Sequence, residues 1–151
     1  MAAHLHPGPD TAPGEAAIAA AMMLKPVYER FSALLGQAAG LLLLTAAGAD
    51  PQAERLHLIS LRAQYAELEE SLRTIAPQPL LPASAEALRR ALPILGEILE
   101  ALRNRQPASE GPLPALLGRL LEVRRLLLAG SAPRLGIGLV DLTGACCAGP
   151  H

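Results

Sequence analysis

The chain has 151 residues, of which 51% are hydrophobic and only 2% aromatic, and its formal net charge is −1. This length allows one domain with a core that needs no disulfide or metal. The near-neutral charge and the scarcity of aromatic rings exclude the usual nucleic-acid binder, which presents a basic face or a base-stacking surface. Most of the apolar residues are Leu and Ala, which favour helices over strands. The sequence therefore predicts an all-α protein.

The first helix is predicted over residues 15–47, after a flexible tail over residues 1–14 that is rich in Pro and Gly. Pro26 marks either a kink or the true start of this helix, because proline lacks the backbone N–H of a helix interior. Apolar residues recur at steps of four and three, the spacing of a buried bundle seam. The seam residues are Val27, Phe31, Leu34, Ala38 and Leu41.

The second helix is predicted over residues 51–75. Gly48 fits a C-terminal cap of the preceding helix, and Asp50 followed by Pro51 fits an N-cap with proline at the first helical position. Its apolar residues again repeat at steps of three and four. The seam consists of Leu58, Leu61, Tyr65, Leu68, Leu72 and Ile75.

Two further helices are predicted over residues 85–105 and 114–129. Ser84 is expected to cap the first of them, Pro93 to kink it, and Gly130 to end the second. Both helices carry seams with the same spacing. The seam residues are Ala85, Leu88, Leu92, Leu95, Leu99 and Leu102 in one helix, and Leu113, Leu116, Leu120, Val123 and Leu127 in the other.

Four helical segments joined by short turns predict an antiparallel four-helix bundle over residues 15–130. The repeat near 3.5 residues favours left-handed packing. Residues 131–151 are apolar and rich in glycine, and they are predicted to form an irregular C-terminal tail. The first and fourth helices carry more leucine than one seam needs, as Leu117 and Leu121 illustrate. Surplus apolar surface of this kind is typically covered by a partner or a second copy.

Residues from Phe31 to Ala49 carry no charged side chain. In one interpretation they form the central helix of a cytoplasmic bundle, surrounded by the other three helices. Gly36 and Gly40 would then allow a close helix approach, and replacing Gly40 by Leu is expected to disrupt the bundle.

Two alternative interpretations place this stretch in the bacterial cell envelope. As an export signal it requires translation from Met22 or Met23, with cleavage after Ala49 in the small-residue triplet Ala47-Gly48-Ala49. As a membrane span it uses Gly36 and Gly40 as a dimerisation face. The high content of Ala, Gly, Ser, Gln and Thr weakens the case for a span, since these residues contribute little to insertion.

Chemistry-bearing residues are sparse, and no cofactor or metal is predicted. Glu54 and His57 form a single E-x-x-H pair, whereas a di-iron carboxylate site needs two such pairs and two further glutamates. Cys146, Cys147 and His151 are weak candidates for a soft metal or a redox role, because their spacing matches no zinc pattern. In the alternative interpretation, the two cysteines have no chemical role and are small residues that pack on the bundle.

The predicted function is that of a non-enzymatic protein-interaction module, such as an adaptor, an assembly factor or a regulatory subunit. The partner is expected to be a protein or a second copy, with no nucleic acid. A match to the helical L-x-x-L-L motif, beginning at Leu113, is assigned to the core because this chain is so rich in leucine. The alternative function is an exported or membrane-anchored protein with thiol chemistry in its tail. The predicted packing or interaction residues are Gly36, Gly40, Leu113, Leu116, Leu117, Leu120 and Leu121.

Overall fold

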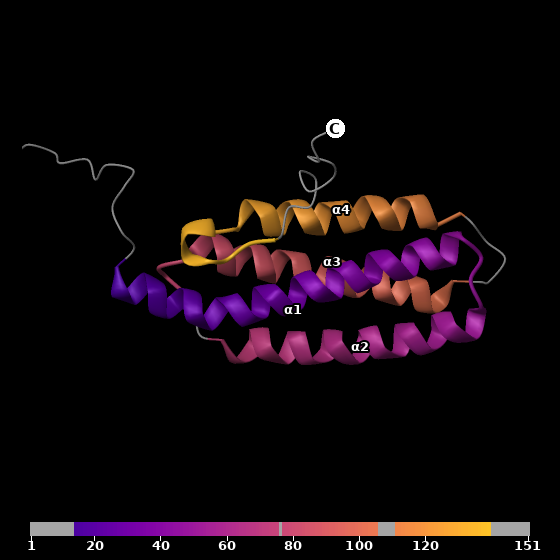
Figure 1. Ribbon diagram of the computed structural model, residues 1–151, viewed down its shortest axis with the longest axis horizontal. Coiled ribbons are helices and arrows are strands. Elements are labelled where there is room, and N and C mark those ends of the chain that lie inside the picture. Colours follow the sequence, from indigo (N-terminus) through magenta and orange to yellow (C-terminus); the bar gives the residue numbers. More distant parts are fainter. Residues whose placement is uncertain (1–13, 76, 106–110, 140–151) are drawn as a thin grey trace, which may run out of the picture.

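A computed structural model describes residues 14–75, 77–105 and 111–139 and confirms the predicted all-α four-helix bundle (Figure 1). A short 3₁₀ turn follows the last helix, and an isolated antiparallel bridge between Ala132 and Ile137 holds it. The elements in chain order are α1 (Glu15–Ala46), α2 (Pro51–Thr74), α3 (Pro82–Asn104), α4 (Leu113–Ala129) and η1 (Pro133–Leu135).

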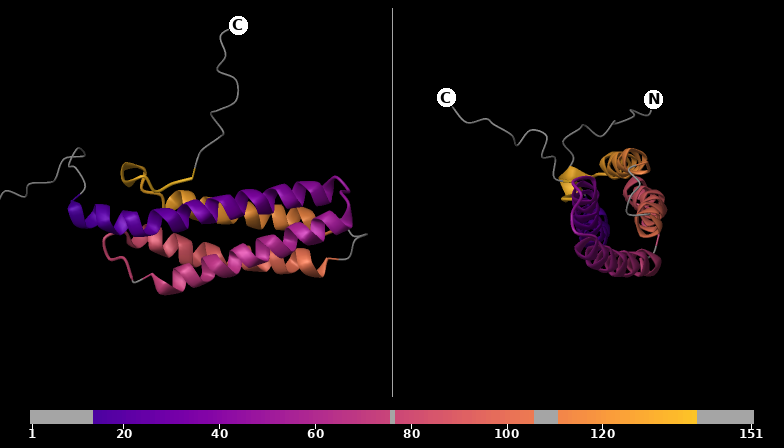
Figure 2. Two further views of the ribbon diagram at one scale, coloured as in Figure 1. Left: turned by 60° about the horizontal axis from the view of Figure 1, so that its bottom comes forward. Right: turned by 90° about the vertical axis from the view of Figure 1, so that its right-hand side faces the viewer.

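The helices run alternately up and down, and seen from the end they lie at the corners of a square (Figure 2). Each helix packs against the next one in the chain, and α4 closes the square against α1. The α1–α4 pair packs less extensively than the three sequential pairs. Helix α1 therefore occupies one corner of the bundle and is not the central helix that its uncharged sequence predicts.

The predicted seams form the core. Every seam residue predicted in α1 is buried, and Tyr28 and Phe31 are fully buried with them. The seam of α2 lies nearer the surface, where Tyr65 is only partly buried. Helices α1 and α3 are continuous through Pro26 and Pro93, so Pro26 is not the start of α1. The alternation of steps of three and four thus identifies the inward-facing residues correctly.

The turn between α1 and α2 forms as its sequence predicts. Gly48 adopts a left-handed conformation with φ +72°, and the N–H of Ala49 donates to the carbonyl oxygen of Leu44 at 3.0 Å. This pattern is the Schellman helix ending, which favours glycine because an L side chain strains that conformation. The carboxylate of Asp50 accepts a hydrogen bond from the N–H of Gln52 at 3.1 Å and caps α2.

The start of α3 differs from the prediction. The helix begins at Pro82, where proline occupies the first position and needs no N–H partner. Ser84 therefore lies inside the first turn and does not cap the helix. Its buried hydroxyl donates instead to the carbonyl oxygen of Gly130 at 2.6 Å, which links the start of α3 to the end of α4.

The close helix approaches occur at other glycines than those predicted. A Cβ atom built on Gly36 or Gly40 meets no heavy atom within 4 Å, so no other helix approaches closely at either glycine. At Gly96 it would lie 2.5 Å from the hydroxyl oxygen of Tyr65, and at Gly130 it would lie 2.3 Å from the Cβ of Ala87. The prediction that Gly36 and Gly40 bring helices together within the bundle is wrong.

Within the part of the chain that the structure describes, no helix has the length and apolar character of a membrane span. Ala47-Gly48-Ala49, the triplet considered as a cleavage site, forms the ordered turn between α1 and α2. The predicted tail over residues 1–14 lies outside the described residues except for Gly14, and so do residues 140–151 of the predicted C-terminal tail.

Candidate functional site

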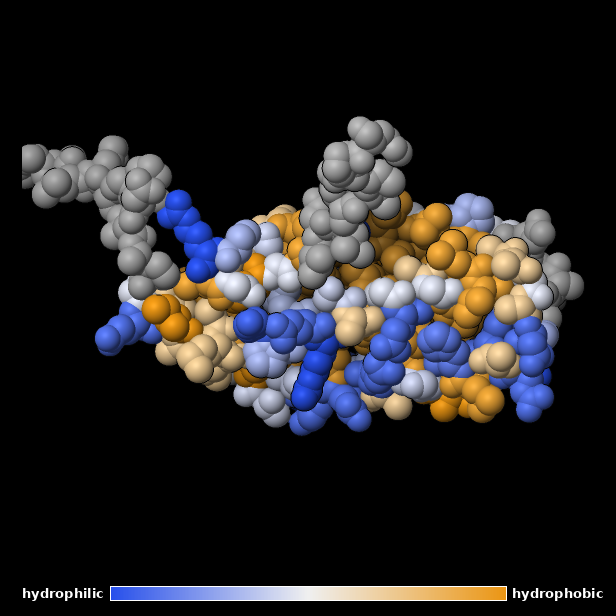
Figure 3. Space-filling view, viewed as in Figure 1, coloured by the Kyte–Doolittle hydropathy of each residue, from blue (hydrophilic) through white to orange (hydrophobic). Residues whose placement is uncertain are grey.

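An exposed apolar face runs along the outer side of α1 and onto α4. Leu43 is 68% exposed and Leu44 is 48% exposed, although both are large apolar residues. Hydrophobic surface gathers over the C-terminal half of α1 and the neighbouring part of α4 (Figure 3). We call this surface the apolar face and define it by Gly36, Gly40, Leu43 and Leu44 of α1 with Leu117 and Leu121 of α4.

The α1 part of this face carries no charge and little polarity. No charged residue occurs between Arg30 and Asp50, and Arg30 itself donates to the hydroxyl oxygen of Ser71 at 3.4 Å. The side-chain amides of Gln37 and Gln64 bond reciprocally across α1 and α2 at 3.3 and 3.1 Å. Because the amide of Gln37 is satisfied toward α2, the outward surface of α1 retains only small and aliphatic side chains.

A shallow groove of about 190 Å³ separates α1 from α4 beside the apolar face. Small residues of α1 line one side, and their short side chains do not reach α4, which explains the less extensive packing of this pair. Leu139, near the end of the described residues, lies partly buried in the groove. The lining consists of Ser32, Leu35, Gly36, Ala39, Leu120, Arg124 and Leu139.

A second and larger cavity, of about 680 Å³, lies at the end of the bundle where α1 ends and α2 begins. We call it the end cavity. Three buried leucines from three helices, Leu41, Leu58 and Leu102, form its apolar walls. Gly48 and Ala49 of the interhelical turn close one side. The cavity is thus built by the ends of α1 and α3 together with the first turns of α2.

Four arginines surround the end cavity: Arg55, Arg62, Arg103 and Arg105. The guanidinium of Arg105 pairs with the carboxylate of Glu54 at 3.5 Å, and both side chains are largely buried, with 11% and 17% exposed. Arg62 and Arg103 both form ion pairs with the carboxylate of Glu100. The remaining one, Arg55, donates from Nε to the backbone carbonyl of Pro51 at 3.4 Å.

Glu100 is shared between two of these arginines. The guanidinium of Arg62 lies 4.0 Å from its carboxylate across α2 and α3, and Arg103 pairs with it within α3. No carboxylate of the described residues lies within ion-pair distance of Arg55. The cavity therefore has an apolar interior and a rim on which positive charge exceeds negative charge.

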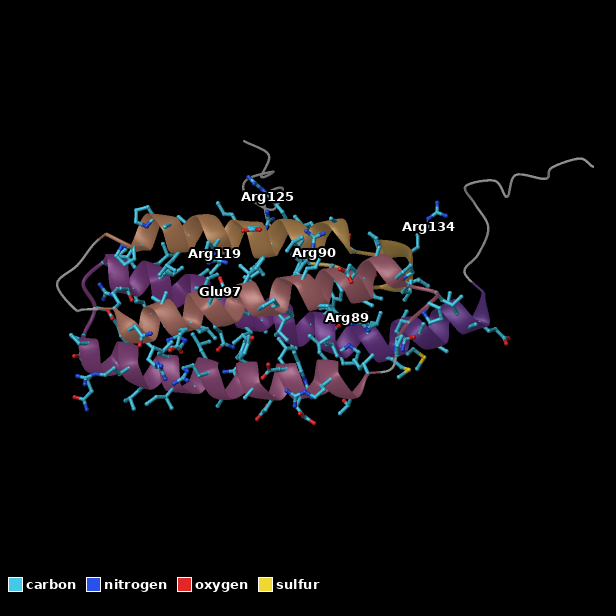
Figure 4. The ribbon with its side chains drawn as sticks, turned by 180° about the vertical axis from the view of Figure 1, so that it is seen from behind. Arg89, Arg90, Glu97, Arg119, Arg125 and Arg134 are labelled. Carbon is cyan, nitrogen blue, oxygen red and sulfur yellow. The ribbon has the colours of Figure 1, made fainter. Side chains whose placement is uncertain are left out.

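The arginines on the α3–α4 side do not converge in the same way. Glu97 of α3 and Arg119 of α4 form an ion pair that bridges the two helices. Arg125 and Arg134 project from separate places along this side (Figure 4).

Two tyrosine hydroxyls of the described residues have raised pKa values. Burial raises the pKa of Tyr28 to about 12, and its hydroxyl donates to the carbonyl oxygen of Leu127 at 3.1 Å. Burial, with a smaller contribution from the nearby carboxylate of Glu69, raises the pKa of Tyr65. Its hydroxyl donates to the carbonyl oxygen of Leu92 at 3.2 Å. Both tyrosines link helices, and a raised pKa keeps their hydroxyls protonated as donors.

The remaining predicted residues fall into three groups. Leu116 and Leu120 are buried in the core; of the other two leucines in the L-x-x-L-L match, Leu113 is partly buried and Leu117 is exposed, so the match belongs only in part to the core. Glu54 pairs with an arginine, and no group of three metal-ligating side chains occurs among the described residues. The thiol and imidazole candidates Cys146, Cys147 and His151 lie outside the described residues.

Sequence reasoning missed the end cavity altogether. Its arginines come from α2, from α3 and from the residue after α3, and in the sequence they look like ordinary solvated helix positions. Comparisons with protein-family models, curated proteins and solved structures find no match for this chain.

Proposed function

We propose that this chain is a non-enzymatic protein-interaction module that associates through the apolar face, and that its partner on that face is a second copy of itself. The main support for this proposal is the exposure of Leu43 and Leu44 beside two glycines with open space above them. Burial of these large aliphatic side chains against a partner would contribute about 25 cal/mol for each Å² of apolar surface removed from water. A role as an assembly or adaptor subunit follows from such a contact.

The residues of α1 on this face are self-complementary about Gly40. Positions spaced four apart, Gly36, Gly40 and Leu44, lie on one stripe of a helix. If two copies of α1 cross antiparallel at Gly40, Leu44 of one copy faces Gly36 of the other. A large side chain then fills the space above a glycine twice, which is the pattern that a two-fold symmetric contact requires.

The absence of charge also favours a second copy over an unrelated protein. Partners of different sequence are commonly selected and steered by complementary charges. The apolar face offers no such charge between Arg30 and Asp50. An uncharged surface can meet its own copy across a two-fold axis without like-charge repulsion.

The test is sedimentation equilibrium of the full chain and of two matched variants of α1. In Leu44→Glu, association buries an unpaired carboxylate on Gly36 of the other copy, and the dimer should weaken about a hundredfold or more. The control is Met22→Glu, at a residue that is 72% exposed near the other end of the same helix. Met22 lies beyond the proposed crossing and this variant should associate as the native chain does.

A native chain that remains monomeric over the concentration range overturns the proposal. Equal weakening by both variants overturns the assignment to the apolar face, because added charge rather than the local contact then decides association. Occupation of the face by another part of the same chain gives the monomeric result.

A further inference from the structure

We propose that the end cavity binds a single-chain amphiphile with an anionic head group, such as a medium-chain fatty carboxylate. The proposed function does not use this cavity, whose lining of α1, α2 and α3 residues shares no described residue with the apolar face. Its volume of about 680 Å³ falls within the range of roughly 300–1,000 Å³ typical of small-molecule sites. Two features of the cavity favour such a ligand, an apolar interior and a cationic rim.

The interior suits an alkyl chain. Leu41, Leu58 and Leu102 present aliphatic surface from three helices, and the cavity has no aromatic side chain on which a base or a sugar ring stacks. Among the described lining residues, the buried or largely buried polar side chains are Thr45, at 7% exposure, and the ion-paired Glu54 and Arg105. A ligand with many hydroxyl groups would lose its hydration without finding partners there.

The rim suits an anion. Four arginines line the cavity, and among the described residues two carboxylates pair with them, Glu54 and Glu100, so that the arginines outnumber the carboxylates there. Arginine presents a planar fork of donors that matches a carboxylate, a sulfate or a phosphate. Arg55 is the first candidate for the head group, because no carboxylate of the described residues is within ion-pair distance and its side chain is already on the rim.

The two features together select the ligand class. A small anion gains nothing from the leucines, and an alkyl cation is repelled by the rim. A two-chain lipid is too large to be enclosed by walls that three helix ends provide, so the occupant is a free amphiphile with one chain. Ile59, 64% exposed at the cavity, offers further aliphatic surface where the chain of the ligand enters.

The test is equilibrium dialysis of the full chain against decanoate below its micellar concentration. Decyltrimethylammonium supplies the same alkyl chain with the opposite charge, and acetate supplies the head group without the chain. We expect saturable binding of decanoate at one site per chain and no saturable binding of the other two. Absence of decanoate binding, or equal binding of the cationic amphiphile, overturns the proposal.

Two arginine variants localise the site. Arg55→Gln should weaken decanoate binding about tenfold, since it removes one charge-assisted contact. The matched control is Arg89→Gln, an exposed arginine on α3 outside the cavity lining, which should bind decanoate as the native chain does. Equal affinities of Arg55→Gln and the native chain contradict the assignment. Leu117→Glu places a charge on the α4 part of the apolar face, and α4 contributes no described residue to the cavity lining, so this variant should leave decanoate binding unchanged and the two proposals fail independently.

Discussion

The two ends of the bundle are held together by different interactions. At the end where α4 stops, three helices approach closely around Gly130, where a Cβ atom would lie 2.7 Å from the hydroxyl oxygen of Tyr28. Buried hydroxyls of Tyr28 and Ser84 donate to backbone carbonyls of α4 and its cap. At the opposite end, arginines and glutamates pair around a cavity of about 680 Å³.

The contrast follows from side-chain size and polarity. Small residues and neutral hydroxyls allow backbones to meet, and each buried hydrogen bond is satisfied without charge. Long arginine side chains occupy more room at the other end, where exposed guanidinium groups such as that of Arg62 can stay in water while their stems cover apolar surface. One end therefore fixes the bundle, and the other leaves room for a ligand.

Gly130→Ala should produce the largest loss of stability. The added methyl group overlaps the Cβ of Ala87 and lies 2.9 Å from the carbonyl oxygen of Ala83, so the backbones must separate. We expect the free energy of unfolding to fall by about 2–3 kcal/mol, measured by chemical denaturation.

Gly118→Ala, inside the helix that Gly130 caps, is its control, because a Cβ atom there meets nothing within 4 Å. It should gain about 0.5–1 kcal/mol from helix propensity. Similar effects of the two substitutions would show that the α4 end is not closely packed.

The pH dependence of stability should report Tyr28. Because its pKa is raised from 10.0 to about 12 on folding, the folded state holds the phenol proton more tightly than the unfolded state. The stabilisation is fully present below pH 10 and is lost as pH rises toward 12, by about 2–3 kcal/mol. Denaturation across this window should show a steeper decline in the native chain than in Tyr28→Phe, and parallel curves would contradict the assignment.

Ser84→Ala should cost about 1–2 kcal/mol. The substitution leaves the carbonyl oxygen of Gly130 without its hydroxyl donor in a buried setting. Ser60→Ala is a suitable comparison, since Ser60 is exposed on α2 and its hydroxyl only accepts a bond from Gln64 at 3.3 Å. Equal unfolding free energies for the two variants would remove the claim that Ser84 joins α3 to α4.

Gly40→Ala should have the smallest effect on the single bundle and a favourable one. Nothing lies within 4 Å of the added carbon, so the helix gains about 0.5–1 kcal/mol of propensity, measured where the chain is monomeric. The same methyl group separates two copies that cross at this residue and weakens their association. A destabilised monomer would contradict the outward orientation of Gly40.

The periodicity of leucine predicts the helices and the core well, because each seam residue needs only its own helix to specify its direction. Val27, Phe31 and Leu41 illustrate this, since all three are buried as predicted. The turn at Gly48 was equally predictable, because its left-handed conformation favours glycine in any context.

Features that depend on two helices at once escaped prediction. Gly36 and Gly96 are both glycines inside a helix, yet only Gly96 lies against a side chain of another helix, because the rotation of each helix about its axis decides the contact. The end cavity escaped for the same reason, since Arg55 and Arg103 are separated in the chain and meet only through the packing of α2 on α3. Only the surplus leucines, such as Leu117, signalled in advance that part of the surface is apolar.

The most direct test of the central claim is a nuclear Overhauser measurement between copies, in a sample that mixes isotope-labelled and unlabelled chains. If the proposed contact forms, we expect magnetisation transfer from the methyl groups of Leu44 in one copy to the α protons of Gly36 in the other. Such transfer would place two α1 helices antiparallel across Gly40. Absence of transfer between copies, or transfer confined to residues of α2 and α3, would contradict the proposed contact.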